Sequence, residues 1–422
     1  MMPWDITDNE KIYLRDLAKK QAEYAALPIM DARKQIWYNL NDGHPDYIPP
    51  VVIETWTFDR DFLPDNVFYC KSVAGRSVEY QILRNIRNYE LINDDKVMPD
   101  FFEINWFLDI DEFGFKVARE TRKDADGFEV GYRYLHPVRD LKADFKLLKP
   151  AVCHVDKEKT LKWKGFLENI FGDLLPVTIR TNNLECTSLT NRAIELMGME
   201  AYYSTMLVNP GEIHRLMAYL RDNALSIMRW AESQGLIVVN NGNQDSFGTS
   251  YNFTGKLPSP GYEGGPARLC DFWGNTNSEE TIGISPEMFK EFCLPYYLDV
   301  CEPFGLVYYG CCEPVHPVWD SISQLPHLKK ISISRWCDED FMSDALRGTE
   351  IVFSRKPDPK YLGINIPLDE ESWRAHIRKT IETTQGVFTE FIIRDVYTVH
   401  GNLNKVGRSI ELARQEIDRY YH

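Results

Sequence analysis

The second half of the chain alternates between short apolar segments and longer amphipathic segments, and this alternation limits the fold more than any other feature. The apolar segments have the length and β-branched composition of buried strands. They lie at 236–240, 306–310, 329–334, 349–354 and 390–395. Strands separated by helices pair in parallel, because the chain must cross back over the sheet between them. The pattern therefore predicts a parallel sheet that is covered on both faces.

Helix-start signals lie between the predicted strands. Asn209 followed by Pro210 begins the longest amphipathic segment, and Gly235 ends it. Other capping residues precede the later helices, namely Ser285, Asp338 and Asp369, and the last helix is expected to end near Tyr420. A run of this many βα units most economically closes into a (β/α)8 TIM barrel, with an open sheet as the alternative.

The first part of the chain is less regular. Only 49–58 and 101–110 have the composition of strands there. We expect residues 1–150 to form an irregular N-terminal extension packed on the barrel, which could contribute its first elements, and residues 151–422 to form the barrel. The connection 241–284 is rich in Gly, Asn, Ser and Pro but also contains aromatic residues. Such a long connection predicts an ordered lid over a site.

Composition excludes several classes of protein. The net charge of −15 argues against a nucleic-acid surface, which needs a basic face. The chain contains no 18-residue apolar run, so no membrane span is expected. Its nine cysteines form no even framework, and the N-terminus has no apolar core of signal-peptide length. Reduced thiols in a cytoplasmic protein are therefore expected. No P-loop, GxGxxG, HExxH or paired CxxC motif is present.

The stretch YYGCCEPVHP, residues 308–317, is the strongest candidate for chemistry. Its strand should end near Gly310, which places the residues that follow at the carboxyl rim, where barrel enzymes carry their active sites. Strand alternation predicts that Tyr309, Cys311 and Glu313 share one face. We therefore expect these side chains to lie at a catalytic rim.

A thiolate and a carboxylate at this spacing could bind zinc if a further ligand comes from another strand. The predicted metal ligands are Cys311, Cys312, Glu313 and His400, with Asp395 as an alternative partner and His316 as a ligand or proton shuttle. Three other interpretations stay open. The cysteines could be small buried hydrophobes, they could form a strained disulfide, and His316 could be a surface residue at a helix start.

Other polar residues follow the predicted strands. Basic groups at two neighbouring strand ends suggest an anionic ligand, or else neutralise Glu313 and Asp395. The predicted substrate-binding residues are Asn241, Asp271, Trp273, Tyr309, Arg335, Trp336, Arg355 and Lys356.

The run SPEMFKEFCLPYYLDVCEPFGLVYYGCCEP, followed by ISIS, SRKPDPKYL and FIIRD, resembles the uroporphyrinogen decarboxylase superfamily. The match is closer to its bacterial methyltransferase-like branch than to the haem-pathway enzyme, whose arginine-bearing N-terminal motif is absent here. The resemblance covers roughly residues 175–420. It implies a TIM barrel, and because barrels of this branch are often dimers, a homodimer is an expectation.

In the corrinoid-dependent methyltransferases of this superfamily, zinc is held by a His-x-Cys pair and a later cysteine, and a partner protein carries the corrinoid. Here the pair reads Tyr309-Gly310-Cys311, and the later region, FIIRDVYTVHG, has no cysteine. The resemblance thus implies a rearranged site that uses Cys311 or Cys312, Glu313 and either Asp395 or His400.

Three functions follow from these observations. The first is a methyltransferase that moves a methyl group from an O- or N-methylated small molecule to a corrinoid protein, with Glu313 as general acid or metal ligand. The second is a metal-independent decarboxylase or lyase for a small carboxylated compound, with Glu313 and Asp395 as acid and base. The third is a ligand-binding barrel without catalysis.

Overall fold

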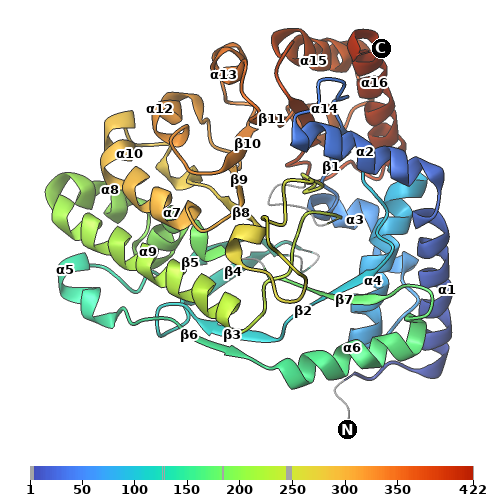
Figure 1. Cartoon of the computed structure of the whole chain (residues 1–422), viewed down its shortest axis with the longest axis horizontal. Coiled ribbons are helices and arrows are strands. Elements are labelled where there is room, and N and C mark those ends of the chain that lie inside the picture. Colours follow the sequence, from blue (N-terminus) through green and yellow to red (C-terminus); the bar gives the residue numbers. More distant parts are fainter. Residues whose placement is uncertain (1–3, 126, 128, 183–184, 244–249, 422) are drawn as a thin grey trace.

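A six-stranded, entirely parallel sheet lies at the centre of the computed structural model, which describes residues 4–125, 127, 129–182, 185–243 and 250–421 (Figure 1). Its strand order is β1-β12-β11-β10-β9-β8, so the first strand pairs with the last. The strands are β1 (Val51–Ile53), β8 (Trp273–Thr276), β9 (Leu306–Tyr309), β10 (Leu328–Ile333), β11 (Val352–Arg355) and β12 (Thr389–Ile393). The predicted parallel sheet is confirmed.

Helices of the second half begin where the capping residues predicted. The Ser285, Asp338 and Asp369 side chains each accept a backbone N–H in the first turn. The larger helices are α9 (Pro210–Ser233), α10 (Pro286–Phe292), α11 (Leu294–Cys301), α13 (Glu339–Leu346), α15 (Glu370–Thr383) and α16 (Leu403–Tyr421). The helix expected after Ser285 is divided at Cys293, because Pro295 has no N–H to continue the hydrogen bonding.

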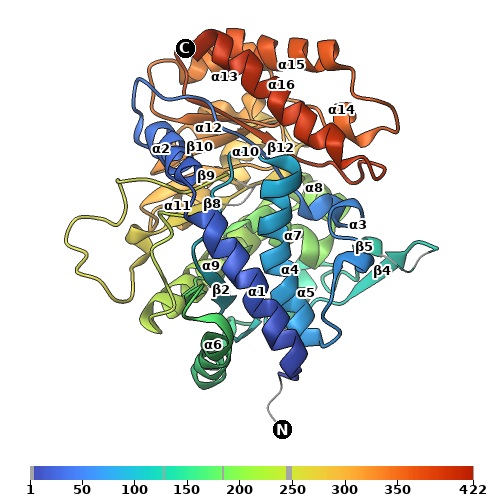
Figure 2. The same ribbon diagram turned by 90° about the vertical axis from the view of Figure 1, so that its right-hand side faces the viewer.

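The N-terminal part adds helices and three smaller sheets. Its helices α1 and α4 run side by side in both views (Figures 1 and 2). The remaining helices are α1 (Asp8–Ala25), α2 (Pro28–Asp42), α3 (Asp59–Phe62), α4 (Val73–Arg87), α5 (Leu141–Asp144), α6 (Lys157–Phe171), α7 (Leu189–Met197), α8 (Met199–Val208), α12 (Trp319–Ile322) and α14 (Lys360–Gly363). No helix in the described part of the chain is long and apolar enough to cross a membrane.

The smaller sheets each contain two strands. Strands β2 (Phe102–Asn105) and β7 (Val177–Arg180) form a parallel pair. Antiparallel pairs join β3 (Leu108–Asp111) to β6 (Val152–Val155) and β4 (Arg119–Lys123) to β5 (Glu129–Tyr134). The first 150 residues therefore contribute β1 to the main sheet and β2 to the pair that lies beside it.

The strands do not form a closed hydrogen-bonded ring among the described residues. The predicted strand at 236–240 joins no ladder, because side chains bond to the backbone at the positions where a neighbouring strand would. The Val238 N–H donates to Thr181 Oγ1 (2.8 Å). The Asn240 amide accepts from the Trp273 N–H (2.7 Å) and donates to the Trp273 carbonyl (3.1 Å). This segment thus lies between β7 and β8 without pairing with either.

A second interruption lies at the outer edge of β1. The Val51 N–H donates to Asp95 Oδ2 (2.7 Å), and the Ile53 N–H donates to Asp94 Oδ2 (2.9 Å). These carboxylates occupy the edge that β2 would need in a closed barrel. The architecture is therefore a mixed α/β fold with a parallel six-stranded sheet, and the closed ring that the sequence predicted is absent among the described residues.

The predicted lid at 241–284 is largely a packed wall. Its residues 244–249 lie outside the described residues. The Asn41 side chain donates to the carbonyls of Tyr251 (3.0 Å) and Phe253 (2.8 Å), which anchors that part of the connection to α2. Further on, Trp273 begins β8 and is buried. The described aromatic residues Tyr251, Phe253, Phe272 and Trp273 are buried, so this part of the connection is a fixed wall, whereas the sequence predicted a lid over a site.

Candidate functional site

Gly310 determines how the cysteines are presented. Strand β9 ends at Tyr309, and Gly310 has a φ of 97°, a conformation that side-chain-bearing residues rarely adopt. Before this turn, the Tyr309 ring packs against Tyr297 of α11. After it, the Cys311 thiol faces Arg394 beyond the end of β12, with 3.7 Å between Sγ and Nη1. The expectation that Tyr309 and Cys311 share a face is therefore wrong, because strand alternation stops at Gly310.

The two cysteines form a compact group of metal-ligating atoms with Glu279. Cys311 Sγ and Cys312 Sγ lie 3.6 Å apart, and Cys312 Sγ donates to Asp395 Oδ2 (3.5 Å). One ligand atom from each of Glu279, Cys311 and Cys312 lies within 4.8 Å of the others. Glu279 is supplied by the turn that follows β8, and the cysteines by the turn that follows β9. The group therefore lies at the carboxyl ends of two paired strands.

The electrostatic surroundings of this group are unusual. The hydrogen bond with Cys312, together with burial, raises the pKa of Cys311, and the Arg394 guanidinium opposes that rise. Burial, with Glu280 nearby, also raises the pKa of Glu279. Both shifts favour the protonated forms of Cys311 and Glu279. A bound divalent cation would instead favour the thiolate and carboxylate forms.

Glu313 lies next to the cysteines, but its carboxylate accepts hydrogen bonds from backbone N–H groups. Its Oε1 accepts from the Ser278 N–H (3.0 Å), and its Oε2 accepts from the Cys311 N–H (2.7 Å). Burial raises the pKa of Glu313 to about 7, although these N–H donors favour its charged form. Its observed role is to tie the turn after β9 to the turn after β8, and thereby to position both cysteines.

The two predicted histidines lie in other surroundings. His316 Nδ1 accepts from the Asp338 N–H (3.3 Å) at the start of α13. His400 is exposed, with Nε2 3.3 Å from the Gly363 carbonyl. Among the described residues, the group that could hold a metal contains neither histidine. The structure thus brings together Cys311, Cys312, Glu313 and Asp395, and places His316 and His400 apart from them.

The predicted anion-binding residues do not form one site. Arg335 pairs with Asp358 (2.9 Å) and lies over the exposed ring of Trp336, 4.0 Å from its centroid. Arg355 is buried and pairs with Glu339 (2.5 Å) of α13.

Lys356 lies in yet another environment. It is buried in the interior of the sheet, where Nζ donates to Tyr308 Oη (2.7 Å) and Ser354 Oγ (2.6 Å). Burial lowers the pKa of Lys356 to about 7. Arg335 and Arg355 therefore share Asp358 as an acidic neighbour, whereas Lys356 bonds to Tyr308 and Ser354.

The remaining predicted residues have structural hydrogen bonds. Asn241 Nδ2 donates to the Leu257 carbonyl (2.7 Å). The buried Asp271 carboxylate accepts from the Ser259 N–H (2.9 Å) and from Arg268 Nε (3.0 Å). Trp273 Nε1 donates to the Asn252 carbonyl (3.1 Å). These contacts hold the connection between residue 240 and α10 in place.

Three residues of the site escaped the sequence interpretation. Glu54 directly follows β1, Glu279 follows β8, and Arg394 follows β12. A charged residue immediately after an apolar run is the signal that could have identified Glu54 and Arg394, because such residues lie at the catalytic edge of a parallel sheet; Glu279 is three residues beyond the polar strand β8 and gives no such signal. The buried Glu54 carboxylate accepts from Arg394 Nε (2.7 Å) and thereby orients the guanidinium toward Cys311.

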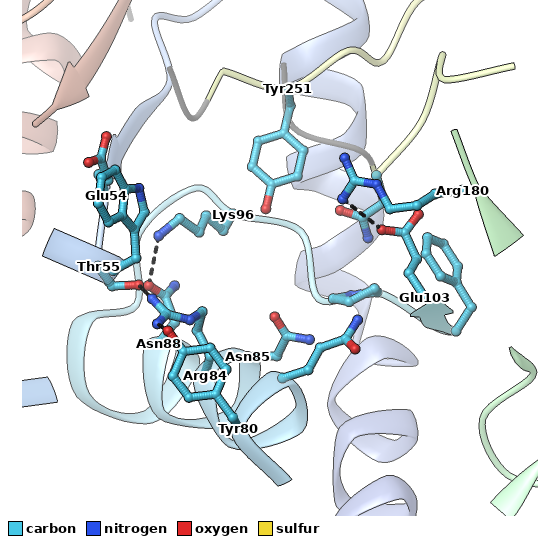
Figure 3. Close-up of a pocket in the computed structure, with 15 residues that line it drawn as sticks. Glu54, Thr55, Tyr80, Arg84, Asn85, Asn88, Lys96, Glu103, Arg180 and Tyr251 are labelled. Atoms are coloured by element: carbon cyan, nitrogen blue, oxygen red, sulfur yellow. Dashed lines mark hydrogen bonds and ion pairs between the residues drawn. The ribbon is translucent and has the colours of Figure 1, made fainter. Parts of the chain in front are cut away.

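A cavity of about 380 Å³ adjoins this ion pair (Figure 3). It opens between the end of β1, helix α4, the segment that leads into β2, and the end of β7. Its wall includes Glu54, Arg84, Lys96, Glu103, Arg180 and Tyr251. Glu54 thus belongs both to the cavity wall and to the chain of contacts that leads through Arg394 to Cys311.

Comparison with known proteins gives a likeness of fold. No family model and no curated protein matches the chain. Chains of solved structures do match, 24 in all, and they include a methyltransferase from Methanosarcina mazei. That match has 12% sequence identity and a TM-score of 0.50, and covers 92% of this chain and 99% of the other. At this identity, the likeness establishes a shared α/β architecture over nearly the whole length.

Proposed function

We propose that the chain is a methyltransferase of the uroporphyrinogen decarboxylase-like superfamily that moves a methyl group from an O- or N-methylated small molecule to a corrinoid protein. The observation that carries the proposal is the Glu279, Cys311 and Cys312 group at the carboxyl ends of β8 and β9. The fold shared with a methyltransferase supports the same class. In this proposal the strands represent a (β/α)8 barrel whose ring is interrupted beside β1 and beside β8.

The donor set fits zinc. Tetrahedral zinc with Zn–S bonds of about 2.3 Å places two sulfur ligands roughly 3.8 Å apart. The Cys311 and Cys312 sulfurs are 3.6 Å apart, with a carboxylate oxygen of Glu279 in the same group. Three protein ligands leave a fourth position for substrate, as catalytic zinc sites require. In this proposal Glu279 is the third ligand, in place of the Glu313 and His400 that the sequence predicted.

The chain's own residues prepare this centre. Zinc, when bound, would polarise the oxygen or nitrogen that carries the methyl group. Arg394 stabilises negative charge on Cys311, and Glu54 holds Arg394 in place. In the metal-free chain Asp395 accepts the Cys312 S–H and fixes the position of its sulfur; that proton has to leave when a metal binds. All nine cysteines are free, which supports the reducing, cytoplasmic location we propose.

Metal content tests the proposal directly. We expect roughly one zinc per chain of purified, tag-free protein, and its loss in the variants Cys311→Ser, Cys312→Ser and Glu279→Gln. Cys153→Ser is the matched control, because Cys153 is also half-buried but lies on β6. The zinc-loaded protein should methylate Co(I) cobalamin from methoxylated or methylamine donors, as followed by absorbance. Zinc that is absent, or that is unaffected by all three ligand variants, would refute the site.

A metal-independent decarboxylase or lyase is the second candidate. It is favoured by two buried groups whose pKa lies near neutrality, Glu313 and Lys356, both at about 7. Groups with such pKa values can exchange protons efficiently at physiological pH. In this proposal Glu313 and Asp395 act as acid and base. Release of carbon dioxide from small carboxylates by metal-free, folded protein would favour this candidate over the first.

A further inference from the structure

The cavity beside Glu54 has charged walls whose charges are already paired. Figure 3 shows Thr55, Arg84, Asn88 and the Lys96 ammonium on one side of the cavity, and Arg180 and Glu103 on the other. Each cation of the wall has an acidic partner. The pairs are Arg84 with Asp59 (2.6 Å), Lys96 with Asp94 (3.4 Å) and Arg180 with Glu103 (3.3 Å). The acidic Glu54 in turn pairs with Arg394 (2.7 Å).

A cavity whose charged side chains are already paired with one another should bind charged ligands weakly. A carboxylate or ammonium group that enters a cavity gives up its hydration, and only a closely placed opposite charge compensates that loss. Here each of these wall cations already bonds a protein acid, so a ligand anion would meet a wall whose positive charge is largely compensated. The cavity therefore favours an uncharged molecule, in contrast to the anionic ligand that the basic residues suggested from sequence.

The same walls are rich in mixed hydrogen-bonding groups. Carboxylate and guanidinium groups lie side by side at Glu103 and Arg180, and the amides of Asn85 and Asn243 contribute to the wall. The buried Oδ1 of Asn243 accepts no hydrogen bond from any described residue. Acceptors beside donors match hydroxyl groups, because each hydroxyl both donates and accepts. A buried acceptor without a partner adds a specific demand for a ligand donor.

The volume and the aromatic lining of the cavity limit the class of ligand further. The volume of about 380 Å³ lies toward the small end of ligand pockets, which span roughly 300–1,000 Å³. Aromatic side chains complete the wall at Trp56, Tyr80 and Tyr251. Such rings pack against the C–H surface of a small cyclic molecule. A single hydroxylated ring satisfies the volume, the polar groups and the aromatic surface together.

We propose that this cavity binds the part of the methyl donor that is not transferred, and that this part is uncharged and rich in hydroxyl groups, as in an O-methylated polyol or sugar. The inference rests on the proposed methyltransferase function. It deepens that function because Glu54 joins the cavity wall to Arg394, whose guanidinium contacts the Cys311 thiol. The donor would thus be held by β2, β7 and α4, beside the sheet that carries the cysteines.

Calorimetric titration tests the ligand class without any need for metal. The protein is the full-length chain carrying Cys311→Ser and Cys312→Ser, treated with chelator. The probes are methyl α-glucopyranoside, methyl β-galactopyranoside and mono-O-methyl inositol, compared with methyl glucuronide and methyl galacturonide. We expect saturable binding of at least one uncharged probe and at least roughly tenfold weaker binding of the uronates, because a buried unpaired charge costs well over 1.4 kcal/mol.

Variants then place the binding in the cavity. Arg180→Met and Asn243→Leu should each weaken the uncharged probe about tenfold or more. Arg133→Met is the matched control, because Arg133 forms an equivalent cross-strand pair with Glu120 (2.7 Å) on the exposed β4–β5 hairpin. Circular dichroism and a melting curve confirm that each variant is folded. If Asn243→Leu does not fold, Trp56→Ala replaces it, because Trp56 is exposed and lines the same cavity.

The possible results test the ligand class of the cavity separately from the proposed methyltransferase function, on which this inference rests. Tighter binding of a uronate or no binding of any uncharged probe would overturn the ligand class, and equal effects of Arg180→Met and Arg133→Met would overturn the assignment of the binding to this cavity. None of these results depends on zinc. If the protein binds an uncharged probe specifically but never acquires zinc, the assignment of the cavity stands. The zinc-dependent methyltransferase would then be refuted.

Discussion

Arg394 and Glu54 form a buried ion pair across the junction of the last and first strands, with Nε 2.7 Å from Oε2 although the residues are 340 positions apart. The pair exists because β12 and β1 are neighbours in the sheet, so the residues that follow them meet at one edge. The guanidinium also reaches Cys311 Sγ. One interaction therefore links the closure of the sheet, the wall of the cavity and the cysteine group.

Removing one member of this pair should be costly. We expect Arg394→Met to lower the free energy of unfolding by about 3–5 kcal/mol, because it removes the guanidinium that bonds the buried Glu54 carboxylate directly. The double variant Arg394→Met with Glu54→Gln should recover most of that loss. Urea denaturation of the four proteins in the cycle measures the coupling. Additive single losses would show that the pair does not interact, and the exposed pair of Arg133 with Glu120 provides a control of under about 1 kcal/mol.

Gly310→Ala should damage both stability and the site. The added Cβ would lie 3.0 Å from the Ser332 Cβ at a φ of 97°, so the turn would have to change. We expect a loss of roughly 1–3 kcal/mol in the free energy of unfolding and lower zinc content. Gly165→Ala is the control, because a Cβ there meets nothing within 4 Å in helix α6. That change should stabilise the protein by about 0.5–1 kcal/mol. Equal effects of the two variants would contradict the assigned strain.

Acid should destabilise the protein through His376. Burial lowers the pKa of His376 to about 4, and its Nε2 accepts the Asp358 N–H (3.2 Å), a bond that only the neutral ring can accept. The unfolded chain, with a histidine pKa near 6.5, binds more protons between pH 6.5 and pH 4. Stability therefore falls as the pH falls through that window, by up to about 3 kcal/mol. His376→Gln should flatten this part of the stability curve, as measured by denaturation at several pH values. An unchanged slope would show that His376 titrates normally.

Asp271→Asn should separate a structural role from a substrate-binding role. The Asp271 carboxylate accepts hydrogen bonds from the Ser259 N–H and the Arg268 side chain. An amide would direct N–H groups at one of these donors, so we expect a loss of about 1–3 kcal/mol in stability. Binding of the uncharged probes by the folded fraction should be unchanged. Weaker binding with unaltered stability would instead return Asp271 to the substrate site.

The sequence predicted those features that depend on local patterns. The apolar runs predicted the strands of the main sheet, and the caps Ser285, Asp338 and Asp369 predicted the starts of helices beside it. Each signal lies within a few residues of the element that it predicts. The adjacency of Cys312 and Asp395 was also predictable, since both follow strands of one parallel sheet. The segment 236–240 was misassigned because side chains bond its backbone, and composition does not reveal such bonds.

The composition of the site was harder to predict. Alternation correctly distinguishes residues on opposite faces only while the strand continues, and the positive φ of Gly310 ends it before Cys311. Arg335 and Arg355 were predicted to bind an anionic substrate, but each pairs with an acid of the protein, Asp358 and Glu339 respectively. The positions of these acids depend on tertiary structure, which the sequence pattern does not reveal. Glu54 was missed for the same reason, because its partner is contributed by the opposite end of the chain.

Strands β1 and β2 belong to different sheets, so the cysteine group and part of the cavity wall are supported by separate sheets. Cys311, Cys312, Glu279 and Arg394 directly follow strands of the six-stranded sheet or lie in the turns after them, whereas Glu103 and Arg180 lie within the β2–β7 pair. Side chains such as Asp94 and Asp95 occupy the β1 edge in place of a backbone partner. Substitutions in the β2–β7 pair, which lines the cavity, would leave intact the backbone hydrogen bonds that set the strand register behind the cysteines. Evolution could therefore change which compound is held without rebuilding the group that acts on it.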